Sequence, residues 1–267
     1  MNTITMLGTG SAFPRNFYHS CFLLSDGSDS LLVDGGGGME VLRRLDRVGM
    51  DLCDLHDMFV THVHTDHIFG AVWVIRRLVQ FSLESRYDGP LRVWANAQVT
   101  EALRIICRLT LLPAYHERME QVVEFRTVVP DDEFSVGGMR LRVIDSCSRG
   151  CEQSGFIATM PDGQTLAFLG DESLTERNLD TVSGVGHLIC GAYCSYADRE
   201  IFRPYEKHHH TVADVAHRAA MAGVGHLILC HCEDHSPDDR AERYAAEAAE
   251  EYAGKVTTPV DGEIICF

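Results

Sequence analysis

Three histidines and an aspartate, in the order His-Val-His-Thr-Asp-His, occupy one short stretch of the chain at positions 62 to 67. The apolar run before them reads as a buried strand, and the pattern over Ala71–Phe81 reads as a helix. At a strand end His62 and His64 point the same way, and the turn into the helix can bring Asp66 and His67 back towards them. A solvated polar loop is the alternative, but packing would not require four such side chains at one junction. Imidazoles and a carboxylate at this density predict a site for a borderline divalent ion, zinc first, then iron or manganese.

The charge balance restricts the partners of the chain. Its 39 acidic and 23 basic residues give a formal net charge of -16 over 267 positions. Such a chain repels polyanions unless a basic patch or a bound metal reverses the local field, so nucleic-acid binding is disfavoured. No apolar run is long enough to span a bilayer, and the N-terminus lacks the basic region of a signal peptide. We therefore expect a cytoplasmic protein without a membrane partner.

Composition also indicates a globular chain with reduced thiols. Hydrophobic residues make up 45% and charged residues 23% of the sequence, so the chain can bury a substantial core, and its 267 residues suit one large domain or two small ones. Ten cysteines in a chain without a secretion signal argue for free thiols rather than a disulfide framework. Most of them are expected to be small buried hydrophobic residues. Cys147 is the exception, as a candidate metal ligand.

The His-x-His-x-Asp-His spacing resembles the signature of the metallo-β-lactamase superfamily of metal-dependent hydrolases. The turn at positions 7 to 14, Leu-Gly-Thr-Gly-Ser-Ala-Phe-Pro, is similar to the start of the ribonuclease Z branch of that superfamily. The resemblance implies an α/β fold, a four-layer αββα sandwich of two mixed β-sheets flanked by helices. Strand and helix patterns in two similar halves, without a linker between them, agree with a single domain over residues 1–267.

Periodicity places the other elements along the chain. Hairpins are expected around Gly137-Gly138 and around Pro161-Asp162-Gly163. The segment Leu111–Gln121 fits neither a strand nor a helix clearly. Helical patterns cover Met39–Val48, Ala71–Phe81, Ala97–Leu109, Thr211–Met221 and Pro237–Tyr252.

Two later strand ends extend the site that the resemblance implies. Asp171 ends the apolar run Phe-Leu-Gly-Asp, and in the superfamily this aspartate bridges two ions; a helix-capping aspartate is the alternative. His231 follows the apolar run Leu227–Cys230 and matches the last ligand of the second ion. Asp34 would support the ligands from behind, or would simply begin a helix-entry turn.

One expected ligand departs from the family pattern. The superfamily supplies a histidine after the strand that ends near Asp145, but positions 143 to 156 contain no histidine. Counting back from Gly155-Phe156, which resembles the Gly-Tyr or Gly-Phe of the family, the position falls on Cys147. A thiolate is a good zinc ligand at about 2.3 Å. Cys151 is the second choice, and a degraded first site that holds one ion or none is the competing interpretation.

Three consecutive histidines stand before a helical pattern. In the ribonuclease Z branch a His-x-Thr at this point contributes a histidine that assists the leaving group. His209-His210-Thr211 is similar, so His209 is the candidate general acid. Thr211 would cap the helix, and His208 and His210 receive no role.

Together the family pattern implies two zinc ions per chain, with manganese or iron as substitutes. A water between the ions would be deprotonated near neutral pH and attack the substrate. Asp171 would orient this hydroxide, and His209 would protonate the departing oxygen. The expected ligands are His62, His64 and Cys147 on the first ion, Asp66, His67 and His231 on the second, and Asp171 between them, with Asp66, Asp171 and His209 as catalytic residues.

The ribonuclease Z branch cleaves phosphodiesters, and transfer-RNA precursors are its best-known substrates. Its RNA-binding arm is inserted between the third ligand and the bridging aspartate, where only 24 positions separate Cys147 from Asp171 here. That length suits a hairpin alone, and the acidic charge balance agrees. We therefore expect a small phosphodiester-type substrate rather than a nucleic acid.

Other functions fit parts of the sequence. An iron-dependent redox or sulfur-chemistry protein on the same fold would make use of the thiols, and a lactone or thioester hydrolase would use the same donor set. A non-catalytic binding protein with a lapsed site would hold less than one ion per chain. Oligomerisation is common in the superfamily, and nothing in the sequence fixes it.

Overall fold

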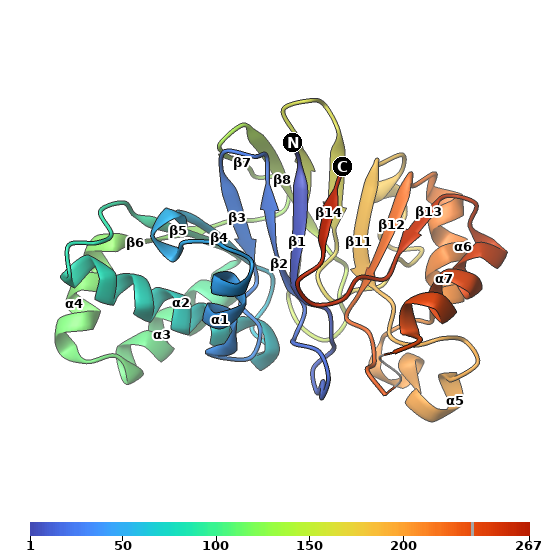
Figure 1. The fold of residues 1–267 in the computed structure, drawn as a ribbon, viewed down its shortest axis with the longest axis horizontal. Helices are drawn as coiled ribbons and strands as arrows, with labels where there is room; N and C mark the ends of the chain where they lie inside the picture. The colour runs from blue at the N-terminus through green and yellow to red at the C-terminus, as the bar shows by residue number, and fades with distance from the viewer. Residues whose placement is uncertain (236–237) are drawn as a thin grey trace.

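Two seven-stranded sheets form the centre of the molecule in the computed structural model, which describes residues 1–235 and 238–267. Helices α1 to α4 lie on one side of the strands and α5 to α7 on the other, and the two termini lie close together (Figure 1). Two mixed sheets flanked by helices are the arrangement that the sequence predicts, so the predicted fold class is confirmed. In the part of the chain that is described, no helix is both long and apolar enough to cross a membrane.

The first sheet combines an antiparallel and a parallel half. Strand order is β14-β1-β2-β3-β4-β5-β6. The strands from β14 to β3 pair antiparallel, and those from β3 to β6 pair parallel. Their bounds are β1 Thr3–Gly8, β2 Cys21–Ser25, β3 Ser30–Val33, β4 Asp57–Val60, β5 Leu91–Ala95, β6 Val123–Thr127 and β14 Ile264–Cys266.

The second sheet has the same mixed character. Strand order is β13-β12-β11-β10-β9-β8-β7. The strands β7 to β10 pair antiparallel, and β10 to β13 pair parallel, so the carboxyl ends of the parallel strands meet at one edge. Their bounds are β7 Glu133–Val136, β8 Met139–Asp145, β9 Ser154–Thr159, β10 Thr165–Phe168, β11 His187–Gly191, β12 His226–Cys230 and β13 Lys255–Thr257.

The helices cover the outer faces of both sheets. One outer core lies between the first sheet and the first four helices, and another lies between the second sheet and helices α6 and α7. The helices are α1 Glu40–Arg47, α2 Thr65–Leu83, α3 Ala97–Thr110, α4 Pro113–Val122, α5 Arg199–Phe202, α6 Val212–Ala222 and α7 Arg240–Glu251, with short 3-10 turns at Leu52–Asp54, Asp180–Val182 and Pro204–Lys207.

Aromatic side chains fill the space between the two sheets. Phe22 of the first sheet meets Phe168 of the second edge to face, with ring centroids 4.9 Å apart. Phe59 and Phe156 make the same kind of contact at 5.3 Å. Strand residues alternate between faces, so each of these rings points inwards from a different strand. One shared core therefore holds the sheets together, and we propose that residues 1–267 fold as one domain.

The largest differences from the predicted helices are the early start of α2 and the presence of α4. Helix α2 begins at Thr65, well before the expected Ala71, because His64 has the extended backbone of an N-cap. The segment that fitted no pattern forms α4, with Pro113 at the start of the helix, where its missing N–H costs nothing. The predicted start of the last helix, Pro237, lies outside the described residues.

Replacing Phe156 by alanine tests the contact between the sheets. Its side chain is fully buried against Phe59 and Phe168. The cavity left behind should lower the free energy of unfolding by about 3–5 kcal/mol. Urea denaturation of Phe156→Ala measures this, and Phe13→Ala, at a side chain that is 93% exposed, is the control. Equal stability of the two variants would contradict a shared core.

Candidate metal centre

The predicted site residues meet where strand ends of both sheets converge. His62 follows β4 in the first sheet, whereas Asp171 and His231 follow the parallel strands β10 and β12 in the second. The amide of Ser154 donates to the carbonyl of Thr61 at 3.1 Å and ties the two sheets together at this point. The fold thus brings residues from distant parts of the sequence to one edge of the sandwich.

Four donor residues form a buried cluster. Asp66, His67, Asp171 and His231 each offer one ligand atom within 4.8 Å of the others. Asp171 lies 3.0 Å from His67 Nε2 through Oδ2 and 3.0 Å from His231 Nδ1 through Oδ1. Nevertheless His67 Nε2, Asp171 Oδ1 and His231 Nδ1 make no hydrogen bond within the described chain. Buried polar atoms without a partner are costly, and a cation held between them would supply one, so these residues fit a divalent ion.

Asp34 fixes the orientation of this cluster. Its carboxylate accepts a hydrogen bond from His67 Nδ1 at 2.8 Å, which leaves His67 Nε2 free as a donor to metal. Asp34 also accepts from the amide and hydroxyl of Thr61 at 2.9 Å. The close approach of Gly35 to Gly70 makes this possible, since a Cβ on Gly70 would lie 1.7 Å from the carbonyl oxygen of Gly35. Asp34 therefore occupies the supporting position that the family resemblance implies.

A second cluster consists of His62, His64 and Cys151. His62 Nδ1 contacts the hydroxyl of Thr61 at 2.9 Å, so its Nε2 points to the site. This Nε2 lies 2.9 Å from His64 Nδ1 and 3.6 Å from Asp171 Oδ2. Two imidazole nitrogens at this distance need a shared proton or a cation between them. Asp171 is thus within reach of both clusters.

The position of Cys147 differs from its predicted place. Its sulfur lies 3.6 Å from the carbonyl oxygen of Arg177 and 3.8 Å from that of Asp145, and it belongs to neither cluster. Counting back from Gly155-Phe156 matched the position to the family pattern, but here Cys147 has a left-handed backbone with φ 62° and its amide donates to the Asp145 carboxylate. The looped backbone brings Cys151 to the two histidines instead.

The buried charges shift one another's pKa values. Burial alone would raise the pKa of Asp171, but the neighbouring His231 and His67 hold it well below its usual range. Burial alone would lower the pKa of His67, but Asp171 and Asp34 raise it well above its usual range. Burial, with repulsion from His67, lowers the pKa of His62 to about 3. At neutral pH His62 is therefore a neutral imidazole, the form that binds metal.

His209, the predicted general acid, lies beside the buried cluster of Asp66, His67, Asp171 and His231. Its ring is 5.0 Å from that of His231 and stacks on Tyr193 at 5.1 Å with an interplanar angle of 6°. Burial, and then repulsion from His231, lowers the pKa of His209 to about 3. The neutral ring can donate a hydrogen bond at neutral pH, but it carries no extra proton until an anion arrives beside it.

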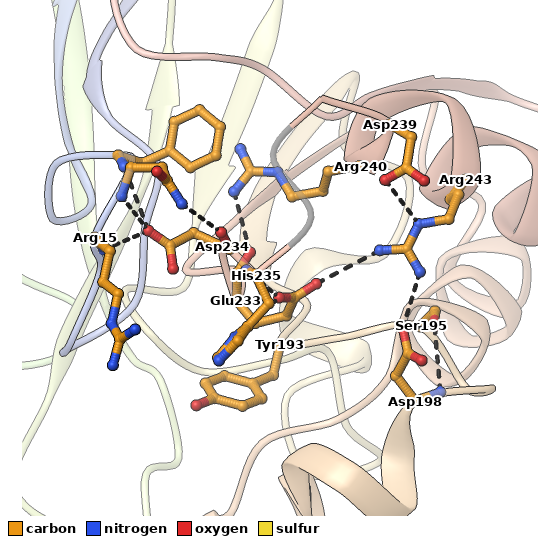
Figure 2. Close-up of polar contacts among 12 residues, drawn as sticks. Arg15, Tyr193, Ser195, Asp198, Glu233, Asp234, His235, Asp239, Arg240 and Arg243 are labelled. Carbon is orange, nitrogen blue, oxygen red and sulfur yellow. Dashed lines mark hydrogen bonds and ion pairs between the residues drawn. The ribbon is translucent and has the colours of Figure 1, made fainter.

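Glu233, just after β12, contacts both Tyr193 and the arginines of α7 (Figure 2). The amide of Glu233 donates to the carbonyl of Tyr193 at 2.7 Å. Arg243 pairs with Asp198 at 2.9 Å and lies 3.7 Å from the Glu233 carboxylate. His231 itself has a left-handed backbone with φ 51°, and its amide donates to the hydroxyl of Ser20. These contacts stabilise an unfavourable backbone conformation at the site.

Asp234, which follows Glu233, holds the loop of residues 15 to 17 through hydrogen bonds (Figure 2). One of its carboxylate oxygens accepts from the consecutive amides of Arg15, Asn16 and Phe17, at 2.5 Å for Asn16 and 3.4 Å for Phe17. The loop leads to His19, whose Nδ1 accepts from the amide of Gly37.

His19 is a neighbour of the site that the sequence analysis missed. Burial lowers its pKa, and charges on Asp66, His67 and His231 act on it as well. Gly10 bridges both His19 and Cys232, which places the glycine-rich turn beside the end of β12. That turn was noted for its resemblance to the family, but nothing in the local pattern singled out the histidine after it.

The fold and this donor set define a metal-dependent hydrolase of the metallo-β-lactamase superfamily, close to ribonuclease Z. The chain belongs to the family described as anti-Pycsar protein Apyc1, whose sequence model matches residues 2–243. It is 28% identical to a ribonuclease Z of Streptomyces avermitilis over 97% of this chain and 95% of that protein.

Solved structures agree on the fold. The metallo-β-lactamase fold protein YhfI of Bacillus subtilis superposes with a TM-score of 0.79 at 19% identity, over 99% of this chain and 98% of that one. The short form of human tRNase Z superposes with a TM-score of 0.74 at 19% identity, over the same shares of the two chains.

Removing the Asp234 carboxylate should loosen the loop before His19. Asp234→Ala leaves the amides of residues 15 to 17 without their acceptor, so the loop should open more often. We expect trypsin to cleave after Arg15 about tenfold faster, measured by mass spectrometry of the N-terminal fragment. Asp239→Ala, which removes the same charge from an exposed position, is the control. Equal cleavage of both variants would show that Asp234 does not hold the loop.

Proposed function

We propose that this protein hydrolyses a small phosphodiester at a centre of two divalent ions. The single observation that carries the proposal is the position of Asp171, which belongs to one donor cluster and lies 3.6 Å from His62 of the other. A carboxylate shared in this way suits two ions held side by side. In this arrangement His62, His64 and Cys151 would hold the first ion, Asp66, His67 and His231 the second, and Asp171 would lie between them.

The ions, when bound, would supply Lewis acidity and a water of lowered pKa. The side chains of the chain itself would position the reactants. Asp171 would accept a hydrogen bond from the attacking water and so direct it towards phosphorus. His209, held flat against Tyr193, would place its ring beside the leaving oxygen and give it a proton. The negative substrate would raise the pKa of His209 on binding, because a nearby anion favours the charged imidazole.

Zinc is the ion that suits this donor set best. Imidazole, carboxylate and thiolate together are typical of zinc, whereas hard oxygen-only sites select magnesium or calcium. Burial raises the pKa of the Cys151 thiol in the protein without metal. A bound ion would reverse this, since coordination removes the thiol proton.

The short stretch of chain between Cys151 and Asp171 supports a small substrate. Strands β9 and β10 and their turn take up most of the chain from Cys151 to Asp171, so no arm protrudes there. The relatives named ribonuclease Z act on RNA by their name. The net charge of -16 opposes a long polyanion at this chain, while a single phosphodiester would be attracted locally by the ions.

Metal content can distinguish whether Cys151 or Cys147 is a ligand of the first ion. We expect two zinc ions per chain in the native protein and about one in Cys151→Ala, because that variant loses a ligand of the first ion. Cys147→Ala, a matched loss of one thiol on the same loop, should keep both ions. Elemental analysis measures the content, and a thiolate-to-cobalt absorption band in the cobalt-substituted protein gives a readout independent of activity.

Two outcomes would contradict this assignment. A cobalt band that persists in Cys151→Ala and disappears in Cys147→Ala would restore the ligand that the sequence predicted. One ion or none in the native protein, without cleavage of bis(p-nitrophenyl) phosphate, would overturn the two-ion hydrolase itself.

The role of His209 can be read from the leaving group. His209→Ala should lower kcat by about 100-fold for a substrate that releases phenolate, because this poor leaving group needs a proton. The loss should be under about tenfold for p-nitrophenolate, which leaves without one. His217→Ala, at an exposed histidine paired with Glu251, is the control. Equal losses for both leaving groups would mean that His209 only positions the substrate.

A further inference from the structure

A pocket of about 330 Å³ opens beside the metal centre and gathers positive charge. Arg149 comes from the loop after β8, Arg177 from the segment after Asp171, and Arg218 from helix α6. His209 also lines the pocket, so the pocket is continuous with the side of the centre where the leaving group would lie. Three guanidinium groups from separate elements thus converge in a chain whose net charge is -16.

These guanidinium groups have no carboxylate partner within the described chain. Among residues 1–235 and 238–267, no carboxylate oxygen lies within 4.0 Å of a guanidinium nitrogen of these three arginines. Arg177 donates to the carbonyl of Cys147 at 2.8 Å and Arg218 to that of Asp214 at 3.3 Å, both neutral acceptors. Many other arginines of this acidic chain do pair with carboxylates, as Arg92 does with Asp57. Unpaired arginines that face a concave space are ready to bind an anion.

The electrostatics of the pocket agree with this reading. Burial lowers the pKa of His210, and Arg218 and Arg149 lower it further, so both lie close to this ring. Glu172 and Glu176 line the same pocket and offset part of the positive charge. Burial raises the pKa of Glu172, whereas Ser148 and the charge of Arg177 act in the opposite direction. The Asp214 carboxylate also acts on His210. Among the residues that line the pocket itself, three arginines face two glutamates.

We propose that this pocket binds a second anionic group of the substrate, a phosphate or carboxylate separate from the phosphodiester that reacts. The proposal rests on the function proposed above, because the reacting group would be held at the two donor clusters. Arg149 and Arg218 are then residues that determine specificity, and neither contacts the donor clusters. Planar guanidinium groups can each bind two oxygens of such a group, which gives direction as well as affinity.

Two thymidine substrates provide the test. Thymidine 5′-(p-nitrophenyl phosphate) and its 3′-phosphorylated derivative release the same nitrophenolate and differ only in a second anion. The native protein should show a KM at least about tenfold lower for the 3′-phosphorylated compound, with similar kcat. Arg149→Ala and Arg218→Ala should abolish that preference and leave the rate on the simpler compound within about twofold. Arg108→Ala, an exposed arginine on α3, is the control, and Arg149→Lys should keep part of the preference.

Calorimetry gives a readout that does not depend on turnover. Thymidine 3′,5′-bisphosphate should bind the native protein more tightly than thymidine 5′-monophosphate, and Arg149→Ala should remove the difference. If Arg149→Ala and Arg218→Ala lowered kcat/KM equally on the two thymidine esters, the arginines would act on the reacting phosphate, and the proposal would be overturned. No preference in the native protein would overturn it as well. Inorganic phosphate that binds as tightly as the bisphosphate would make the pocket a site for free phosphate, again overturning it.

The two proposals can fail separately. Arginine-dependent binding of the bisphosphate without hydrolysis of either ester would support the anion pocket and overturn the phosphodiesterase. Hydrolysis of both esters at equal KM, with two ions per chain, would support the phosphodiesterase and overturn the anion pocket.

Discussion

Burying the carboxylate of Asp171 costs free energy that the surrounding imidazoles must offset. The carboxylate lies 3.0 Å from a nitrogen of His67, at the start of α2 beside the first sheet, and 3.0 Å from a nitrogen of His231, which follows β12 in the second. Their relative position therefore depends on the contact between the sheets and on the ends of β10 and β12. Asp34 anchors His67 from behind, and the contacts of Glu233 hold the segment after His231. A disturbance in any of these supports would separate donors that have few other partners.

The parts of the site that follow local rules could be predicted from the sequence. His62, His64, Asp66 and His67 lie within one strand-helix junction, where the backbone geometry dictates which side chains converge. Asp171 and Asp34 come shortly after apolar strands, so the strand patterns indicated at which end of the sheets they lie. The two predicted hairpins correspond to the pairs β7–β8 and β9–β10, because alternating burial and a turn between the strands leave a clear signal.

The remaining parts depend on loops and on contacts distant in the sequence. Cys147 and Cys151 lie on one irregular loop in which Cys147 has a left-handed backbone, and periodicity does not predict which sulfur in such a loop faces the histidines. Tyr193 and His19 reach the site only because distant segments pair with the end of β12. The early start of α2 was hidden because its first turn consists of polar ligand-type residues that weaken the helical pattern.

One short loop connects the proposed metal centre with the proposed anion pocket. The residues between β8 and β9 place Cys151 beside His62 and His64 and Arg149 in the adjoining pocket. A metal bound through Cys151 would stiffen the loop and so order Arg149 before a substrate arrives, which lowers the entropic cost of binding.

The contact between Gly35 and Gly70 has a different kind of consequence. Here the helix α2 touches the loop after β3 through backbone alone, with the amide of Gly70 on the carbonyl of Gly36 and the amide of Gly35 on that of His67. Because neither glycine position has room for a single methyl group, no pair of larger side chains could compensate for one another there. The distance between helix and sheet, on which all the donors around the centre depend, is therefore set by backbone contacts that no side-chain substitution can adjust.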